Sequence, residues 1–445
     1  MSLAAFEMEV YFRELSARLF ASLHAEEVMF ASYEGERSDF VRINQSRIRQ
    51  AGRVRQQFLE LNLIHDGRQL NASLSLTGQL DDDLAQAKFC LKQLRERLPF
   101  LPRDPFLSHA TERFELREVT DNELPPSRQA VEAILAAADG LDLVGLWSGG
   151  ELVRGLAGSV GQYGWHRQSS FNFDWSVYHQ ADKASKQSCA GAHWDSAVAL
   201  RQISAAREDL AMLAKPPRTI QPGRYRVFLS PSAMFEILTL LNWGGFGLKS
   251  HRTQQTPLLR MVKEGVELDG RIHLTEDHAG GLTPRFTRRG FVKPERVELI
   301  SAGRYRDCLA NSRSAKEYGV AVNCAIEHPE SLVMQGGQLP RMDVLRALDT
   351  GIYVSNLWYC NYSDRNHCRI TGMTRFACFW VEGGKPVAPI NVMRFDESLF
   401  DVLGDKLVDL TVEQDYIVDF TTYGKRSENS ARLPGALVDD FRFTL

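Results

Sequence analysis

Cysteine and histidine residues stand at several spacings that could bind a metal ion. A thiolate and an imidazole four residues apart on a helix point to one face, where both can reach the same ion. The candidate sets are Cys189/His193, Cys324/His328, and Cys360 followed by His367 and Cys368. None is accompanied by the second half of a four-ligand zinc site at a known spacing. Because free cysteines are among the most buried residues, the pattern favours buried thiols and histidines without a metal.

Other catalytic motifs are incomplete. Residues 157–161 read Ala-Gly-Ser-Val-Gly, in which alanine replaces the first glycine of the G-x-S-x-G nucleophile turn. The glycine-rich run at 244–250 lacks the adjacent Gly-Lys with which a P-loop holds phosphates. These segments are therefore interpreted as turns between elements and not as a serine hydrolase or nucleotide site.

Basic residues gather after the Gly280-Gly281 turn. They are Arg285, Arg288, Arg289, Lys293, Arg296, Arg304 and Arg306. The whole chain has 53 Lys and Arg against 56 Asp and Glu, a net charge of −3, so it has no overall positive charge for a phosphate backbone. We expect this stretch to be a solvated loop or an electrostatic surface for a peptide or partner subunit, and nucleic acid is disfavoured as a partner.

Helices and strands must position these residues, and the first hundred residues show both periods. Residues 4–23 carry apolar side chains at helical spacing. Alternating leucines at 59–63 and 70–76 flank Asp66-Gly67, which predicts a hairpin. Asp81-Asp82-Asp83 opens a helix that ends in the proline cluster at 99–105. This cluster is the first candidate domain boundary.

The remainder divides into a mixed segment and a strand-rich segment. Pro125-Pro126 starts a helix, aromatic residues alternate between 143 and 178, and Asp195 can cap a helix that runs to about residue 214. Strand and turn signals dominate after residue 221. We predict an α+β fold with an N-terminal α/β domain (1–100), a second α/β segment of the N-terminal half (106–217) and a large sheet-rich C-terminal domain (221–445).

Length and composition support a multi-domain globular protein. The chain has 445 residues, which is longer than a single hydrophobic core usually serves. Its hydrophobic fraction of 44% is ordinary for a globular protein. Seven dispersed cysteines without a CxxC pair are typical of reduced thiols. Neither a secretory signal nor an apolar stretch of membrane-spanning length is evident, so we expect a cytoplasmic protein without membrane association.

From about Arg207 the order of features resembles the TldD/PmbA (TldE) family of zinc metallopeptidases, also labelled modulators of DNA gyrase. The resemblance spans nearly the whole chain, and the order and spacing of its motifs carry it. Its motifs are the stretch 223–231 (GRYRVFLSP), the short helix at 233–242, the segment 351–354 (GIYV), the hairpin 379–387 (FWVEGGKPV) and the ending 430–437 (SARLPGAL).

The resemblance implies a cytosolic dimer in which an active TldD-like subunit carries H-E-x-x-x-H on the helix after the Ser-Pro turn and a cysteine near its C-terminus. Two imidazoles and a thiolate would hold zinc, and the glutamate would take a proton from the bound water. Here Glu236 matches the general-base position. Phe235 and Leu240 occupy the histidine positions, and Tyr423 replaces the cysteine. Phenylalanine and leucine offer no lone pair to zinc.

The resemblance therefore favours a TldE/PmbA-like, non-catalytic subunit of a metallopeptidase that acts on unfolded peptides. No cofactor is expected on this chain itself, and zinc would belong to an active TldD-like partner. Two alternatives remain open. One is a metallopeptidase with a relocated site that uses Cys360, His367 and Cys368 or Cys324 and His328. The other is a homodimeric scaffold or binding protein derived from the peptidase fold.

Overall fold

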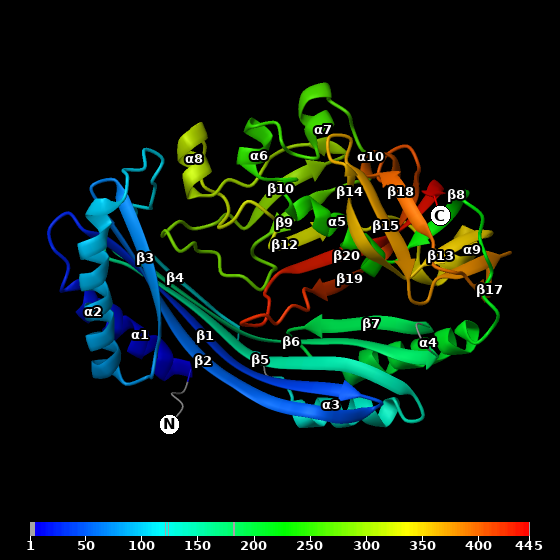
Figure 1. The fold of residues 1–445 in the computed structure, drawn as a ribbon, viewed down its shortest axis with the longest axis horizontal. Coiled ribbons are helices and arrows are strands. Elements are labelled where there is room, and N and C mark those ends of the chain that lie inside the picture. Colours follow the sequence, from blue (N-terminus) through cyan, green and yellow to red (C-terminus); the bar gives the residue numbers. More distant parts are fainter. Residues whose placement is uncertain (1–4, 121, 123, 181–182, 445) are drawn as a thin grey trace.

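The computed structural model describes residues 5–120, 122, 124–180 and 183–444. Figure 1 shows a long curved N-terminal sheet with the C-terminal part of the chain on its concave side. The elements of the N-terminal half are α1 Ala5–Phe20, β1 Val28–Asn44, β2 Arg47–His65, β3 Arg68–Ser75, α2 Leu80–Arg97, the short 3-10 helix η1 Leu98–Phe100, β4 Phe114–Val119, α3 Ser127–Ala137, β5 Asp142–Gly158, β6 Gln162–Gln180, β7 Lys183–Gly191 and α4 Ser196–Leu213.

The elements of the C-terminal half are shorter. They are β8 Gly223–Leu229, α5 Pro231–Thr239, η2 Leu240–Asn242, α6 Leu248–Arg252, α7 Leu259–Glu264, β9 Leu274–Asp277, β10 Arg296–Ser301, β11 Arg304–Tyr305, α8 Ser312–Tyr318, β12 Ser331–Met334, η3 Arg341–Asp343, α9 Val344–Leu348, β13 Gly351–Val354, β14 Asn356–Asp364, β15 Arg369–Arg375, β16 Phe379–Glu382, β17 Lys385–Pro389, β18 Arg394–Ser398, α10 Leu399–Val402, β19 Leu407–Val418 and β20 Ser430–Phe443. The predicted α+β class with a sheet-rich C-terminal part is confirmed.

Seven strands in the described part of the N-terminal half form one sheet in the order β3-β2-β1-β5-β6-β4, with β7 also paired to β6. The predicted hairpin is its β2–β3 edge. Asp66 and Gly67 both have positive φ (50° and 68°), the turn conformation whose twist matches that of the two strands. Strands on both sides of the proline cluster at 99–105 therefore belong to the same sheet.

Helices cover two separate regions of the outer face of this sheet. Alternate residues of β1 point to that face. Met29 and Tyr33 pack with α1 and α2 at one end, whereas Val41 and Ile43 pack with α3 and α4 at the other. Asp195 caps α4 as expected, because its side chain accepts a hydrogen bond from Ala197 N. Among the described residues, no helix lies above the outer face between the two helical covers (Figure 1).

Thirteen strands among the described residues form the C-terminal sheet, and β20 is at its centre. This strand pairs with β8, β12, β18 and β19. The pairing of β20 with β12 is parallel, although the two strands lie about a hundred residues apart. Helix α5 packs on this sheet within a core that includes Met234, Ile237 and Leu238.

The basic stretch after residue 281 joins the two halves of the chain. Arg285 Nε contacts Glu118 on β4 at 2.6 Å, and Arg288 Nη1 contacts Glu60 on β2 at 2.7 Å. Lys293 is buried and pairs with Glu330 at 2.9 Å. The expectation of a solvated stretch is wrong for Lys293, which is buried, whereas Arg288, Arg296, Arg304 and Arg306 are exposed. Arg285 and Arg288 pair with acidic residues of the N-terminal strands that are remote in sequence.

No helix in the described ranges has both the length and the hydrophobicity that a membrane span requires.

Candidate functional site

Helix α5 begins where the Ser-Pro turn after β8 supplies its cap. The Ser230 hydroxyl accepts from Ala233 N at 3.2 Å and donates to the carbonyl oxygen of Ser355. Pro231 fills the first helical position, where no backbone N–H is needed. The start of this helix is therefore set by local chemistry and anchored to the strand-rich core through Ser355.

The three family positions on α5 and the adjoining η2 have different environments. Leu240 is 4% exposed and belongs to the core of the C-terminal domain. Phe235 and Glu236 are partly buried and line a cavity of about 300 Å³. The cavity lies between α5 and the segment that connects β19 to β20.

Glu236 has no hydrogen bond or ion pair with any described residue. Burial raises the pKa of its carboxyl group, and the nearby ammonium group of Lys186 on β7 acts in the opposite direction. A carboxyl group in this setting holds a proton more readily than an exposed glutamate. A general base acting on a metal-bound water also needs a metal ion beside it, and neither imidazole nor thiolate lines this cavity among the described residues.

The opposite wall of the cavity belongs to the loop at residues 419–429. Asp419, the only carboxylate that this loop contributes to the cavity lining among the described residues, is fully engaged. Its carboxylate accepts from Thr421 N at 2.9 Å, from Thr421 Oγ1 at 3.0 Å and from Ser427 Oγ at 3.2 Å. These bonds hold the loop closed.

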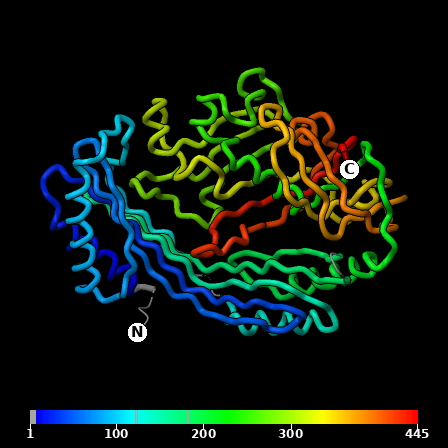
Figure 2. The backbone as a smooth tube through the Cα atoms, in the orientation of Figure 1, coloured from blue at the N-terminus to red at the C-terminus, as the bar shows by residue number. Residues whose placement is uncertain are grey.

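A buried arginine fixes the same loop to the inner face of the N-terminal sheet. Arg426 donates to Ser38 Oγ at 2.8 Å, to the carbonyl and hydroxyl oxygens of Ser170 at 2.9 and 3.1 Å, and to Gly150 O at 2.8 Å. Burial lowers the pKa of its guanidinium to about 10, so it remains charged at neutral pH. Figure 2 shows the turn between β19 and β20, in red, against the N-terminal strands.

Tyr423 lies on the exposed part of this loop and is fully accessible to solvent. It does not line the cavity at α5. The structure thus places Phe235 and Glu236 at the cavity, Leu240 in the core and Tyr423 on the surface.

These residues do not fit a zinc ion. The family site needs two imidazoles and a thiolate around one point. The chain offers a phenyl ring, a buried leucine and a remote phenol, and of the two carboxylates at the cavity that of Asp419 is occupied by hydrogen bonds. No zinc chemistry can be assigned to this helix.

The cysteine-histidine sets are not assembled either. Cys360 and Cys368 face the core, and burial raises the pKa of each thiol to about 12. His367 is exposed and contacts Asp364 through Nδ1 at 2.8 Å. Residues 321–330 contain no helix, so the spacing argument for Cys324 and His328 does not apply.

Ligand-type side chains converge elsewhere in the described residues, at Glu276, His278 and Glu330. His278 Nδ1 lies 3.2 Å from Glu276 Oε1, and its Nε2 lies 3.0 Å from Asn323 O. Lys293 Nζ contacts Glu330 at 2.9 Å and already supplies a cation there. We interpret this group as a buried ion-pair network that connects the basic stretch to β12.

The C-terminal half of the chain matches a known protein family. Residues 222–445, half of the chain, match the model described as the PmbA/TldA metallopeptidase C-terminal domain. The chain belongs to this family. The resemblance drawn from the sequence is thereby confirmed. A comparison with curated proteins gives no match.

Solved structures share the fold of this chain over almost its entire length. TldE from Thermococcus kodakarensis has a TM-score of 0.77 at 15% identity, with 99% of this chain and 100% of that chain covered. A protein from Thermotoga maritima described as a modulator of a DNA gyrase has a TM-score of 0.75 at 14% identity, covering 97% and 100%. One from Bacteroides thetaiotaomicron with the same description has a TM-score of 0.73 at 15% identity, covering 98% of each chain.

Sequence reasoning located the helix and its altered positions but missed Arg426 and Asp419. Both lie within four residues of Tyr423 in the sequence. A lone arginine and a lone aspartate in a polar loop give no local sign of burial, and the partners of Arg426 on the N-terminal strands are more than 200 residues away. Only the register of β1, β5 and β6 brings those acceptors together.

Proposed function

We propose that the chain is a TldE/PmbA-like, non-catalytic subunit of a cytoplasmic zinc metallopeptidase dimer that degrades or processes unfolded peptides. The carrying observation is the environment of the family's metal positions. Phe235 lines a cavity, Leu240 is in the core and Tyr423 is on the surface, so the positions neither offer ligands nor converge. Family membership supplies the peptidase context.

In this proposal zinc and the hydrolytic glutamate belong to a TldD-like partner subunit. This chain completes the dimer, and its cavity beside α5 forms part of the wall that the peptide meets. Glu236 is then a partly buried wall residue. The cavity lining includes no imidazole or thiolate among the described residues, so Glu236 has no metal-bound water to activate, which supports that role.

Reconstitution tests the proposal. The chain is purified alone and together with a TldD-like subunit from the same genome, and zinc content and hydrolysis of an unfolded casein substrate are measured. We expect zinc and activity only in the mixture, and the Glu236→Gln variant should leave the rate of the complex nearly unchanged. Stoichiometric zinc in the isolated chain, or loss of activity with Glu236→Gln, would contradict the assignment. A stable homodimer that ignores the TldD-like subunit would favour a scaffold.

A variant with the family's ligand types tests whether the side chains at the three positions are all that prevents zinc binding. The triple variant Phe235→His, Leu240→His and Tyr423→Cys supplies the family's three ligand types. We expect it to bind no more zinc than the parent chain, because position 240 is in the core and position 423 is on the exposed part of a pinned loop. Tight, stoichiometric zinc binding by this variant would show that the positions do converge.

A further inference from the structure

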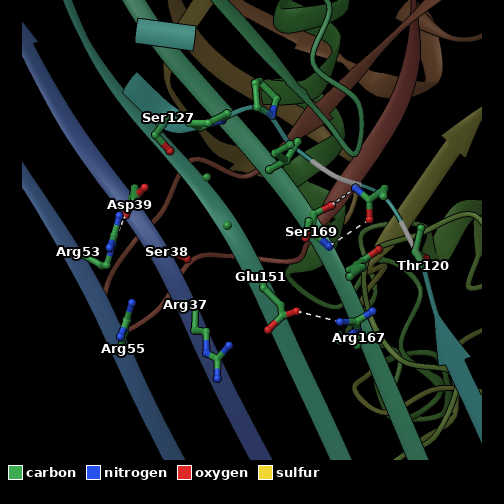
Figure 3. A pocket seen from close by; sticks show the side chains of 17 residues that line it. Arg37, Ser38, Asp39, Arg53, Arg55, Thr120, Ser127, Glu151, Arg167 and Ser169 are labelled. Carbon is green, nitrogen blue, oxygen red and sulfur yellow. Dashed lines mark hydrogen bonds and ion pairs between the residues drawn. The ribbon is translucent and has the colours of Figure 1, made fainter. Parts of the chain in front are cut away.

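A polar groove of about 750 Å³ crosses the outer face of the N-terminal sheet, between its two helical covers. It is lined by β1, β2, β5 and β6 and by the segment that leads into α3, as Figure 3 shows. Loop 419–429 docks on the opposite face, at Ser38 and Gly150. The groove is therefore separate from the cavity at α5, and its volume falls in the range of small-molecule sites.

Arginine side chains dominate the groove, and two of the four are already paired. Arg53 Nε contacts Asp39 Oδ1 at 2.7 Å, and Arg167 Nη1 contacts Glu151 Oε2 at 3.2 Å. Asp39 and Glu151 are the carboxylates that line the groove among the described residues, and each takes part in one of these pairs, although Glu151 Oε1 has no hydrogen-bond partner there.

The other two arginines of the groove, Arg37 and Arg55, have no carboxylate partner among the described residues. They are directly opposite each other in the antiparallel β1–β2 ladder, and neither forms an ion pair within the described ranges. The one hydrogen bond assigned to Arg37 goes to the weak acceptor Met8 Sδ at 3.7 Å, and Arg55 is exposed. Like charges at directly opposed positions destabilise a strand pair. An anion with two oxygens would remove that cost, because guanidinium groups bind carboxylates and phosphates through paired hydrogen bonds.

A buried N–H group beside Gly149, a residue of the groove lining, adds a second, independent sign of a missing acceptor. Trp147 is 1% exposed, and its indole Nε1 has no hydrogen-bond partner in the described structure. A Cβ atom built on Gly149, a groove residue two positions along β5, would stand 3.2 Å from that nitrogen. The glycine therefore leaves space beside a donor that buried indole groups normally satisfy.

The far wall of the groove is held in place by one side chain. Asn122 donates from Nδ2 to Ser169 O at 2.7 Å and to Ala192 O at 2.6 Å, and its Oδ1 accepts from Ser169 N at 3.3 Å. The hydroxyl groups of Ser127 and Ser169 line the groove nearby. A fixed wall with hydroxyl groups offers donors and acceptors for the uncharged part of a ligand.

We propose that this groove binds a small molecule through an oxyanion group, carboxylate or phosphate, that bridges Arg37 and Arg55. The polar remainder of the ligand extends over Gly149 toward the Trp147 N–H. The site needs no metal and no second subunit, and it is independent of the peptidase assignment.

Thermal unfolding of the full chain tests the proposal with three probes at constant ionic strength: pyrophosphate, citrate and a tetrapeptide with a free C-terminal carboxylate. We expect at least one probe to raise the melting temperature in a saturable manner, beyond the effect of sodium chloride. The probe that saturates at the lowest concentration identifies the source of the oxyanion. If none exceeds sodium chloride, the proposal is wrong.

Three variants locate the effect. Arg37→Gln and Arg55→Gln should weaken the probe by roughly tenfold or more, since each removes charge-assisted hydrogen bonds. Arg55→Gln should also raise the melting temperature without any probe, because it removes a like-charge contact. The matched control Arg201→Gln, an exposed arginine of α4, should behave as the parent chain. Equal responses in all three variants would assign the effect to nonspecific screening and overturn the proposal.

Discussion

Replacing Arg426 with alanine should release loop 419–429 from the N-terminal sheet. The guanidinium is 4% exposed and donates to acceptors on three strands. Its Nε also lies 3.7 Å from Glu36 Oε1. Alanine would leave these acceptors without the guanidinium donor and would remove the cation beside the buried Glu36, whose Oε2 still accepts from Gln56 Nε2. Breaking a buried charged contact in this way costs about 3–5 kcal/mol. The change should appear locally, since the loop contributes little to either hydrophobic core.

Hydrogen exchange at two loop amides provides the assay. Asp419 N donates to Asn429 O at 2.9 Å, and Ser427 N donates to Thr421 O at 3.1 Å, so both amides report the closed loop. A loss of about 3 kcal/mol corresponds to roughly a hundredfold faster exchange.

The control Lys425→Ala removes a half-exposed pair with Glu34 (2.7 Å) from the same loop and should cost about 1 kcal/mol or less. If Arg426→Ala changed exchange no more than Lys425→Ala, the pinning role would be refuted.

Three further predictions concern the N-terminal half. Burial raises the pKa of Glu34 and of Glu118, but their cationic neighbours outweigh this effect and lower each pKa to about 2. The stability that these carboxylates provide is therefore complete above about pH 4.5 and is lost as the pH falls toward 2. Urea midpoints measured across this pH range should fall less steeply in Glu118→Gln than in the parent chain. Cys90 is half-buried, and this partial burial raises the pKa of its thiol; because a reagent can still reach it, Cys90 should react first with a thiol reagent. Cys90→Ser should remove that first equivalent, and first reaction at another cysteine would contradict this. Gly150→Ala should destabilise the chain by about 2 kcal/mol or more, because φ is +152° and a Cβ atom would stand 2.0 Å from Arg37 O. The control Gly52→Ala should be almost neutral, since no atom lies within 4 Å of its Cβ position. Equal losses of stability in a denaturation experiment would contradict the steric argument.

Local chemistry explains which elements could be predicted from the sequence. The Asp66-Gly67 turn and the Asp195 cap depend on residues within a few positions of each other, and both are present in the structure. The parallel pairing of β12 with β20 depends on contacts between residues 331–333 and 430–432, which no periodicity reveals. The ion pairs that join the basic stretch to the N-terminal sheet could not be predicted for the same reason, because Glu118 and Glu60 precede Arg285 and Arg288 by more than 160 residues.

The candidate site shows the same limit. The Ser-Pro turn and the apolar run that follows it are local signals, and they are enough to locate α5 and the altered positions Phe235 and Leu240. The exposure of Tyr423 could not be inferred, since it depends on the docking of Arg426 between strands. The unpaired arginines at 37 and 55 could not be found from spacing, because their opposition follows from the register of β1 and β2.

Zinc content and peptidase activity, measured on the isolated chain and on its complex with a TldD-like subunit, test the central claim most directly. The account predicts that the isolated chain contains no stoichiometric zinc and hydrolyses no unfolded substrate, and that activity appears with the TldD-like subunit and survives Glu236→Gln in this chain. Zinc-dependent hydrolysis by the isolated chain, abolished by Glu236→Gln, would contradict it.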